Sequence, residues 1–185
     1  MLVNSMKEQS RRGNGTKPRF IVDAMLGDLA RWLRMLGYDT IYERNMPDWK
    51  QLEIAAEQGR ILLTRDRGLY IRARKRGIRS LLVHGDNIVD RLYIVAKTFR
   101  LQLDIDPDSS RCPLCNAPLR RADKSEVKGR VPPQVYEKYS IFWVCSDCGQ
   151  VYWRGGHWRG ILATLEEVKK KMGQRSRATS PTQTR

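Results

Sequence analysis

The chain has 185 residues, enough for one domain or two small ones with a modest core. Lys and Arg number 35 against 20 Asp and Glu, a net charge of +15, and 41% of residues are hydrophobic, which is typical of a globular protein and not of a wholly disordered one. No apolar run approaches the roughly 20 residues of a membrane-spanning helix, which argues against an integral membrane protein. The polar, basic N-terminus carries no apolar signal segment, so we expect a cytoplasmic protein without membrane contacts.

Much of the positive charge lies at the two ends. Residues 1–18 carry a net +3 and residues 169–185 a net +6, and neither segment has an apolar period. This composition predicts disordered tails. Basic tails on a basic body favour a polyanionic partner, with nucleic acid first, although such charge can also serve solubility alone.

Short apolar runs alternate with segments of helical period between residues 20 and 100. The runs predict buried strands at 20–22, 40–42, 61–64 and 80–83. The periodic segments predict helices at 25–36, 48–59, 67–76 and 87–100. The alternation predicts an α/β domain at residues 19–104, with a mostly parallel sheet and helices on both faces.

The character of the sequence changes after residue 104. Residues 104–110 are polar and predict a linker. Aromatic and turn residues then replace the helical period, which predicts a second, smaller module at 111–160. Residues 161–171 predict a short helix leading into the basic tail.

All four cysteines lie in this second module, as two C-x-x-C pairs separated by 29 residues: Cys112 with Cys115, and Cys145 with Cys148. Four thiolates form a closed tetrahedral set that suits structural Zn²⁺, and so small a module needs such a staple. A redox dithiol would need one C-x-x-C at a helix start, and disulfides are disfavoured in a cytoplasmic chain. The long spacer predicts an insertion at 120–140.

Carboxylates follow two of the predicted strands. Asp23 comes directly after the first strand and Asp66 after the third, and ligands of open α/β sheets bind outside the carboxyl ends of strands. Asp48, at the start of the second helix, and Asp28, one turn into the first, are further candidates. Clustered carboxylates repel unless a hard cation such as Mg²⁺ or Mn²⁺ lies between them, and such an ion can activate water against a phosphate.

Helix capping is the alternative role for these acids. Asp48-x-x-Gln51 fits a capping box, Asp66 fits an N-cap, and Asp28 suits the positive end of a helix dipole. Spacing favours capping for Asp48 and Asp28. Asp23 follows a buried strand, where no cap is needed, so a functional role leads there.

Arginines surround these acids. Arg65 and Arg67 flank Asp66, and Arg31 and Arg34 flank the acidic end of the first helix. Cations beside an acidic metal centre suit a phosphodiester substrate, because the metal takes one phosphate and the arginines take its neighbours. The alternative is a solvated helix face.

Residues 20–40, FIVDAMLGDLARWLRMLGYDT, strongly resemble the opening motif of the Mut-seven carboxy-terminal RNase domain family. Residues 60–66, RILLTRD, resemble its second motif, and the two cysteine pairs with residues 152–157, YWRGGH, resemble its zinc-ribbon signature. The resemblance covers about residues 19–160. It implies a PIN-like nuclease fold with a fused zinc ribbon, and a metal-dependent ribonuclease.

Five positions of the chain resemble the PIN pattern: Asp48, Ala55, Ala56, Thr64 and Asp66. The first acid of that pattern corresponds to Asp23. This implies that Asp23, Asp48 and Asp66 hold Mg²⁺ or Mn²⁺, that Asp28 is a further catalytic candidate, and that Thr64 orients an acid or water. The chain has one acid, Asp48, where the family often shows a pair.

The aromatic segment near residue 155 offers a second way to contact RNA. His157 and Trp158 are expected at a surface, where they can stack on unpaired bases, and Trp153 is expected inside; alternatively, these rings form only the small core of the ribbon. We therefore expect a ribonuclease acting on RNA, with ribosomal RNA, transfer RNA or the ribosome as candidate partners. The alternatives are a non-catalytic RNA- or ribosome-binding protein and a metal-dependent phosphatase of small substrates.

Overall fold

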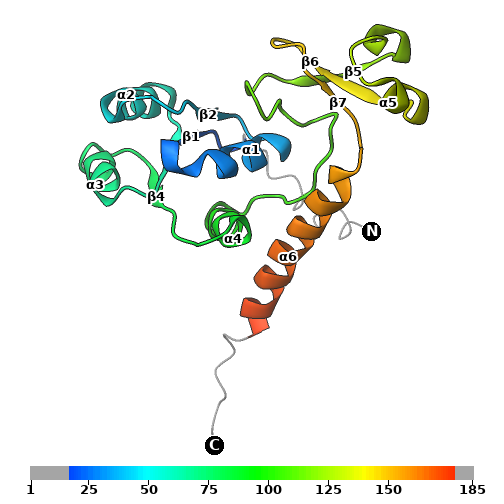
Figure 1. Ribbon diagram of the computed structural model, residues 1–185. Helices are drawn as coiled ribbons and strands as arrows, with labels where there is room; N and C mark the ends of the chain where they lie inside the picture. Colours follow the sequence, from blue (N-terminus) through cyan, green and yellow to red (C-terminus); the bar gives the residue numbers. More distant parts are fainter. Residues whose placement is uncertain (1–16, 178–185) are drawn as a thin grey trace, which may run out of the picture.

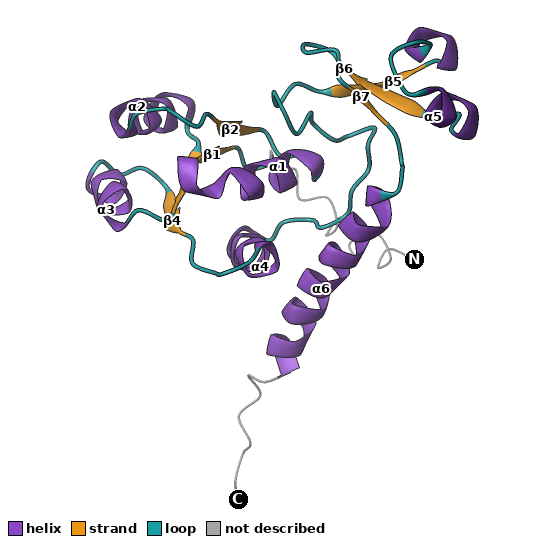
Figure 2. Ribbon diagram, viewed as in Figure 1, coloured by secondary structure: helices purple, strands orange, loops and turns teal. Residues whose placement is uncertain are grey.

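The structure, a computed structural model, describes residues 17–177 of the chain (Figure 1). Most of the predicted N-terminal tail and residues 178–185 lie outside the described residues. An α/β domain is followed by a smaller antiparallel module, and a long final helix runs from that module back along the α/β domain (Figure 2). The described residues include no helix long and apolar enough to span a membrane.

A four-stranded parallel sheet forms the centre of the α/β domain, as predicted. Its strands are β1 (Phe20–Val22), β2 (Thr40–Tyr42), β3 (Ile61–Thr64) and β4 (Ser80–Leu82). They lie in the order β2-β1-β3-β4, so the chain first moves outward from β1 and then returns to the other side of it. The switch point therefore lies between the carboxyl ends of β1 and β3, where open α/β sheets form their ligand crevices.

Helices cover both faces of the sheet, and the alternating side chains of β1 explain why. Phe20 and Val22 point into one core, with the 3₁₀ helix η1 (Ala24–Leu26) and helices α1 (Gly27–Met35) and α4 (Ile88–Phe99). Ile21 points into the other core, with α2 (Asp48–Gln58) and α3 (Arg67–Lys75). The α/β fold class and its parallel sheet are confirmed.

The final helix, α6, corrects the prediction for the C-terminal segment. It runs through His157–Arg177, so it begins before the helix expected at 161–171 and continues through residues 172–177, which were expected to lie in the disordered tail. Leu165 and Val168 are buried in the α/β core, and α6 packs along α4 (Figure 1). Leu165, Val168 and Met172 recur at helical spacing, but the many lysines and glutamates around them hide this narrow apolar stripe. The chain thus leaves the α/β domain, forms the small module and returns.

The small module is a three-stranded antiparallel sheet. Its strands are β5 (Leu119–Ala122), β6 (Phe142–Cys145) and β7 (Val151–Tyr152), in the order β5-β6-β7. The connection between β5 and β6 contains η2 (Lys124–Val127) and α5 (Pro133–Lys138). The predicted insertion at 120–140 is therefore mostly this helical connection, although its first three residues belong to β5.

Candidate active site and zinc centre

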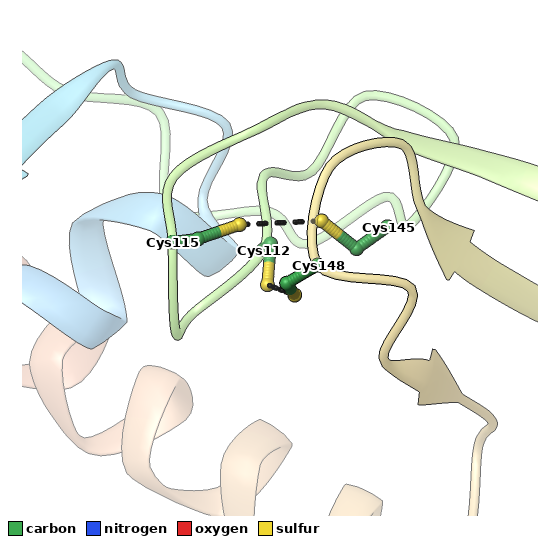
Figure 3. Close-up of side chains that lie close together, drawn as sticks. All are labelled: Cys112, Cys115, Cys145 and Cys148. Carbon is green, nitrogen blue, oxygen red and sulfur yellow. Dashed lines mark hydrogen bonds between the residues drawn. The ribbon is translucent and has the colours of Figure 1, made fainter.

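The four cysteines meet at the end of the small module that faces the α/β domain (Figure 3). Their Sγ atoms lie within 4.8 Å of one another, with Cys112 3.6 Å from Cys148 and Cys115 3.3 Å from Cys145, and none forms a disulfide. A tetrahedral ion with Zn–S bonds of about 2.3 Å places its sulfurs about 3.8 Å apart, close to these separations. The donor set therefore fits structural zinc.

Hydrogen bonds to sulfur make this set suitable for a cation. Burial alone would raise the pKa of the Cys145 thiol, but the backbone N–H groups of Cys148 and Asp147 outweigh burial and lower its pKa to about 7. The Tyr152 hydroxyl lies 3.1 Å from the Cys112 sulfur, and burial raises the pKa of that hydroxyl, so it stays protonated and can donate. The backbone donors thus stabilise the Cys145 thiolate, whereas burial and the neighbouring thiols raise the pKa of Cys115 and Cys148.

Arg34 holds the loop of residues 112–115, here called the zinc loop, against the α/β domain. The expectation that Arg34 engages phosphate is therefore wrong. Its side chain is 3% exposed. The guanidinium donates to the carbonyl oxygens of Pro113 and Leu114, between the first two cysteines, and to that of Thr40, each at 2.9 Å. Burial lowers the pKa of Arg34, and the nearby cysteine thiolates oppose that shift. A side chain this buried and already hydrogen-bonded to three carbonyl oxygens is not free to bind an RNA phosphate.

A second set of contacts strengthens the same junction. The side chain of Asn116 accepts from the Thr40 N–H at 2.9 Å and donates to the Asp39 carboxylate at 2.7 Å. Asp39 also pairs with Arg60 at 2.9 Å. Burial alone would raise the pKa of the Asp39 carboxyl, but the hydrogen bonds from Arg60 and Asn116 outweigh burial and lower that pKa. The zinc loop and the edge of the parallel sheet are therefore one hydrogen-bonded unit.

At the switch point, Asp23 is held by the neighbouring strand. Its carboxylate is 7% exposed and accepts from the Thr64 hydroxyl at 2.6 Å and from the Arg65 N–H at 3.3 Å. It also accepts from the Met25 N–H at 3.2 Å, which caps η1. Asp23 therefore caps η1, which corrects the expectation that no cap is needed there. Its hydrogen bonds with Thr64 and Arg65 are additional to this capping role.

Thr64 connects the two acids at this rim. Its hydroxyl donates to Asp23 and accepts from the Asp66 N–H at 2.9 Å. The Asp66 carboxylate is exposed and caps α3 by accepting from the Leu69 N–H at 2.7 Å. Asp23 and Asp66 thus lie just beyond the carboxyl ends of the adjacent strands β1 and β3, and the Thr64 hydroxyl bonds to both residues.

The other two acids are paired with arginines. Asp48, the first residue of α2, pairs with Arg72 of α3, and Asp28 pairs with Arg91 of α4 at 2.6 Å. The predicted capping box at Asp48 is absent, because Pro47 is the N-cap and makes no side-chain cap. Within residues 17–177 the cysteines are the one group of three or more potential ligands close enough to share an ion. Asp23, Asp48 and Asp66 do not form a common ligand set in this structure.

The remaining arginines divide between two regions. Arg65 and Arg67 are exposed beside the rim and form no ion pair with any described residue. Arg31 is exposed but lines a cavity of about 360 Å³ with Pro113 and Leu114, so it lies by the zinc loop and not beside Asp23.

The aromatic residues match the expected burial only in part, because Trp153 and Trp158 are both half-buried. His157 is exposed and Trp158 half-buried at the start of α6, whereas Trp153 packs partly buried against the core of the small module. Whether any of them contacts RNA stays a prediction.

The comparison with family models decides the classification. Residues 18–165 match the Mut7-C RNAse domain. The chain belongs to the Mut7-C RNAse domain family. The match spans the α/β domain, the cysteine-bearing module and the beginning of α6, and it gives the chain a nuclease-like, RNA-related function. No match was found among curated proteins or solved structures.

Sequence reasoning missed the residues that organise this Mut7-C domain internally. Arg72 and Arg91 pair with Asp48 and Asp28, and no pattern in the sequence singled out either arginine as the partner of an acid. Asn116 and Asp39, which join the zinc loop to the sheet, carried no pattern of their own. The one available signal was the residue directly after each cysteine pair: Asn and Gly both tolerate positive φ, and Asn116 and Gly149 adopt it.

Proposed function

We propose that this protein is a divalent-metal-dependent ribonuclease with its reaction centre at Asp23 and Asp66. One observation carries the proposal: a nearly buried carboxylate at the switch point of the sheet, oriented from the adjacent strand by Thr64 and the Arg65 N–H. Each carboxylate oxygen has two lone pairs, so Asp23 can accept these hydrogen bonds and still bind a further ligand. Membership of the Mut7-C family supports RNA as the substrate.

The rim offers a hard cation two carboxylates and not a full set of protein ligands. Mg²⁺ is commonly held by one or two carboxylates together with waters and substrate phosphates. Asp23 and Asp66 would supply that pair, and Asp48 would join only after leaving Arg72. The ion, when bound, supplies polarisation of the phosphate and a water of lowered pKa.

The chain's own residues would orient and bind. Thr64 holds the Asp23 carboxylate in one rotamer through its 2.6 Å hydrogen bond. The exposed Arg65 and Arg67 side chains would neutralise phosphates on either side of the scissile one. Thr64 thus positions the Asp23 carboxylate and the arginines position the RNA strand, while the two acids would hold the ion that binds the reacting phosphate.

A non-catalytic RNA-binding function is the second candidate. It is favoured by the pairing of Asp48 and Asp28 with arginines, which withdraws two acids from the rim. A domain that only binds RNA needs its cations and not a free acidic cluster.

Incubation of the full chain with labelled single-stranded RNA and Mg²⁺ or Mn²⁺ distinguishes the two. We expect cleavage, lowered about 100-fold or more in Asp23→Asn, because losing a metal ligand costs at least as much as losing its supporting contacts. Asp123→Asn, at an exposed acid of the small module, should cleave like the wild type. Both variants should keep their zinc content and circular dichroism. Tight binding without cleavage in either metal would refute the nuclease and support the second candidate.

A further inference from the structure

A large cleft lies away from the acidic rim, where the small module meets α6. It has a volume of about 730 Å³, within the range of about 300–1,000 Å³ of small-molecule sites. Its walls come from α5, from β7 and the segment after it, and from the first turn of α6. We call it the ribbon groove; its aromatic lining consists of Tyr139, Tyr152, Trp153, His157 and Trp158.

Charge in and around the ribbon groove is positive. No Asp or Glu lines it, whereas Lys138 does. Arg154 lies next to it, with its guanidinium 5.6 Å from the Trp143 ring and 5.1 Å from the Trp158 ring. Neither cation forms an ion pair with any residue in the described range 17–177. An anionic ligand with flat rings would find both of its features matched here.

Two glycines in the groove wall differ in what they leave open. A Cβ on Gly155 would lie 2.5 Å from the Trp153 indole nitrogen, so Gly155 is required for that ring to pack. A Cβ on Gly156 would meet nothing within 4 Å. The backbone at Gly156 is therefore open to a ligand, and the fold does not need glycine there.

We propose that the ribbon groove binds unpaired nucleotides of the RNA strand, with bases stacked on Trp158 and phosphates near Lys138. Base stacking on aromatic side chains combined with a cationic groove is how single strands are bound without strong sequence preference. The proposal rests on RNA as the substrate of the proposed function, but not on cleavage.

The position of the groove also predicts a length dependence. Helix α1 begins near the acidic rim and Met35, at its other end, lines the groove. At 1.5 Å per residue, this helix separates the two regions by about 13 Å. A strand must therefore span several nucleotides to occupy both, and short oligonucleotides should not benefit from the groove.

Fluorescence anisotropy with labelled RNA tests the proposal in the full-length, zinc-loaded protein. For a single strand of ~12 nucleotides, within the usual site sizes, Trp158→Ala should raise Kd about tenfold and Trp158→Phe should recover most of the loss. Duplex RNA of the same sequence should bind each variant equally. Leu162→Ala, which shortens an exposed side chain of the same helix, is the matched control and should leave both affinities unchanged.

Lys138→Gln provides a second variant that alters only an exposed side chain. It should lower the magnitude of the salt slope of single-strand binding by about 0.7, the value expected for one phosphate contact. Single-strand RNA carrying 5-iodouridine should also crosslink within the peptide that contains Trp158.

The results separate this proposal from the nuclease. If no RNA is cleaved but Trp158→Ala still weakens single strands selectively, the groove stands and catalysis falls. If RNA is cleaved and both groove variants bind like the wild type, the groove proposal is refuted. Equal loss of single-strand and duplex binding, or photocrosslinking of RNA only elsewhere, would also overturn it.

Discussion

Replacement of Arg34 by methionine removes the charge that joins the zinc loop to the α/β domain but keeps most of the side-chain length. The lost contacts are three hydrogen bonds of 2.9 Å, to the carbonyl oxygens of Thr40, Pro113 and Leu114. Hydrogen bonds to charged groups contribute about 1.5–3 kcal/mol each, and buried carbonyls left without a donor add a penalty. Relief of the buried charge offsets part of this sum, since desolvation disfavours the guanidinium.

We expect a net loss of about 3–5 kcal/mol in the free energy of unfolding, because three lost hydrogen bonds of this kind outweigh the relief of the buried charge. For a chain of this size that lowers Tm by roughly 6–20 °C. Because two of the acceptors lie between Cys112 and Cys115, zinc should also leave the variant faster. Guanidinium unfolding followed by circular dichroism gives the first quantity, and a chromogenic zinc chelator gives the second.

Arg31→Met is the matched control, because Arg31 lies on the same helix with an exposed side chain. It should change the free energy of unfolding by less than about 0.5 kcal/mol. If Arg34→Met is as stable as this control, or releases zinc at the wild-type rate, the inference that Arg34 couples the two modules is refuted.

Three further outcomes follow from packing, the thiolates and the Asp39 contacts. Leu165→Ala should cost about 2–5 kcal/mol by thermal unfolding, because Leu165 is 2% exposed, whereas Leu162→Ala at a 43% exposed position should cost little; equal effects would contradict the docking of α6. Cys148→Ser should abolish stoichiometric zinc binding by elemental analysis, and full retention of zinc would contradict the four-thiolate site. Since the folded-state pKa of Asp39 is lowered, its contribution to stability should be complete above its unfolded pKa of about 4 and be lost as pH falls further; Asp39→Asn should flatten that acid limb, and an unchanged pH profile of unfolding would contradict it.

The sequence was sufficient where the signal is local. Strands such as 20–22 and 61–64 are short apolar runs, and side-chain periodicity along the next dozen residues indicates a helix whatever the rest of the chain does. The two C-x-x-C pairs likewise carry their chemistry within four residues, so the ligands were evident before the fold. Asp23 and Asp66 were placed at one rim because parallel strands share a direction.

Only the tertiary structure decided which partner each charged side chain takes. Arg34 meets Pro113, 79 residues away, and Arg91 meets Asp28, 63 residues away. The sequence around an arginine does not show whether its side chain is exposed or buried, because burial depends on which distant segment packs over it. The same reason applies to α6, whose narrow apolar stripe has meaning only because α4 offers a complementary surface.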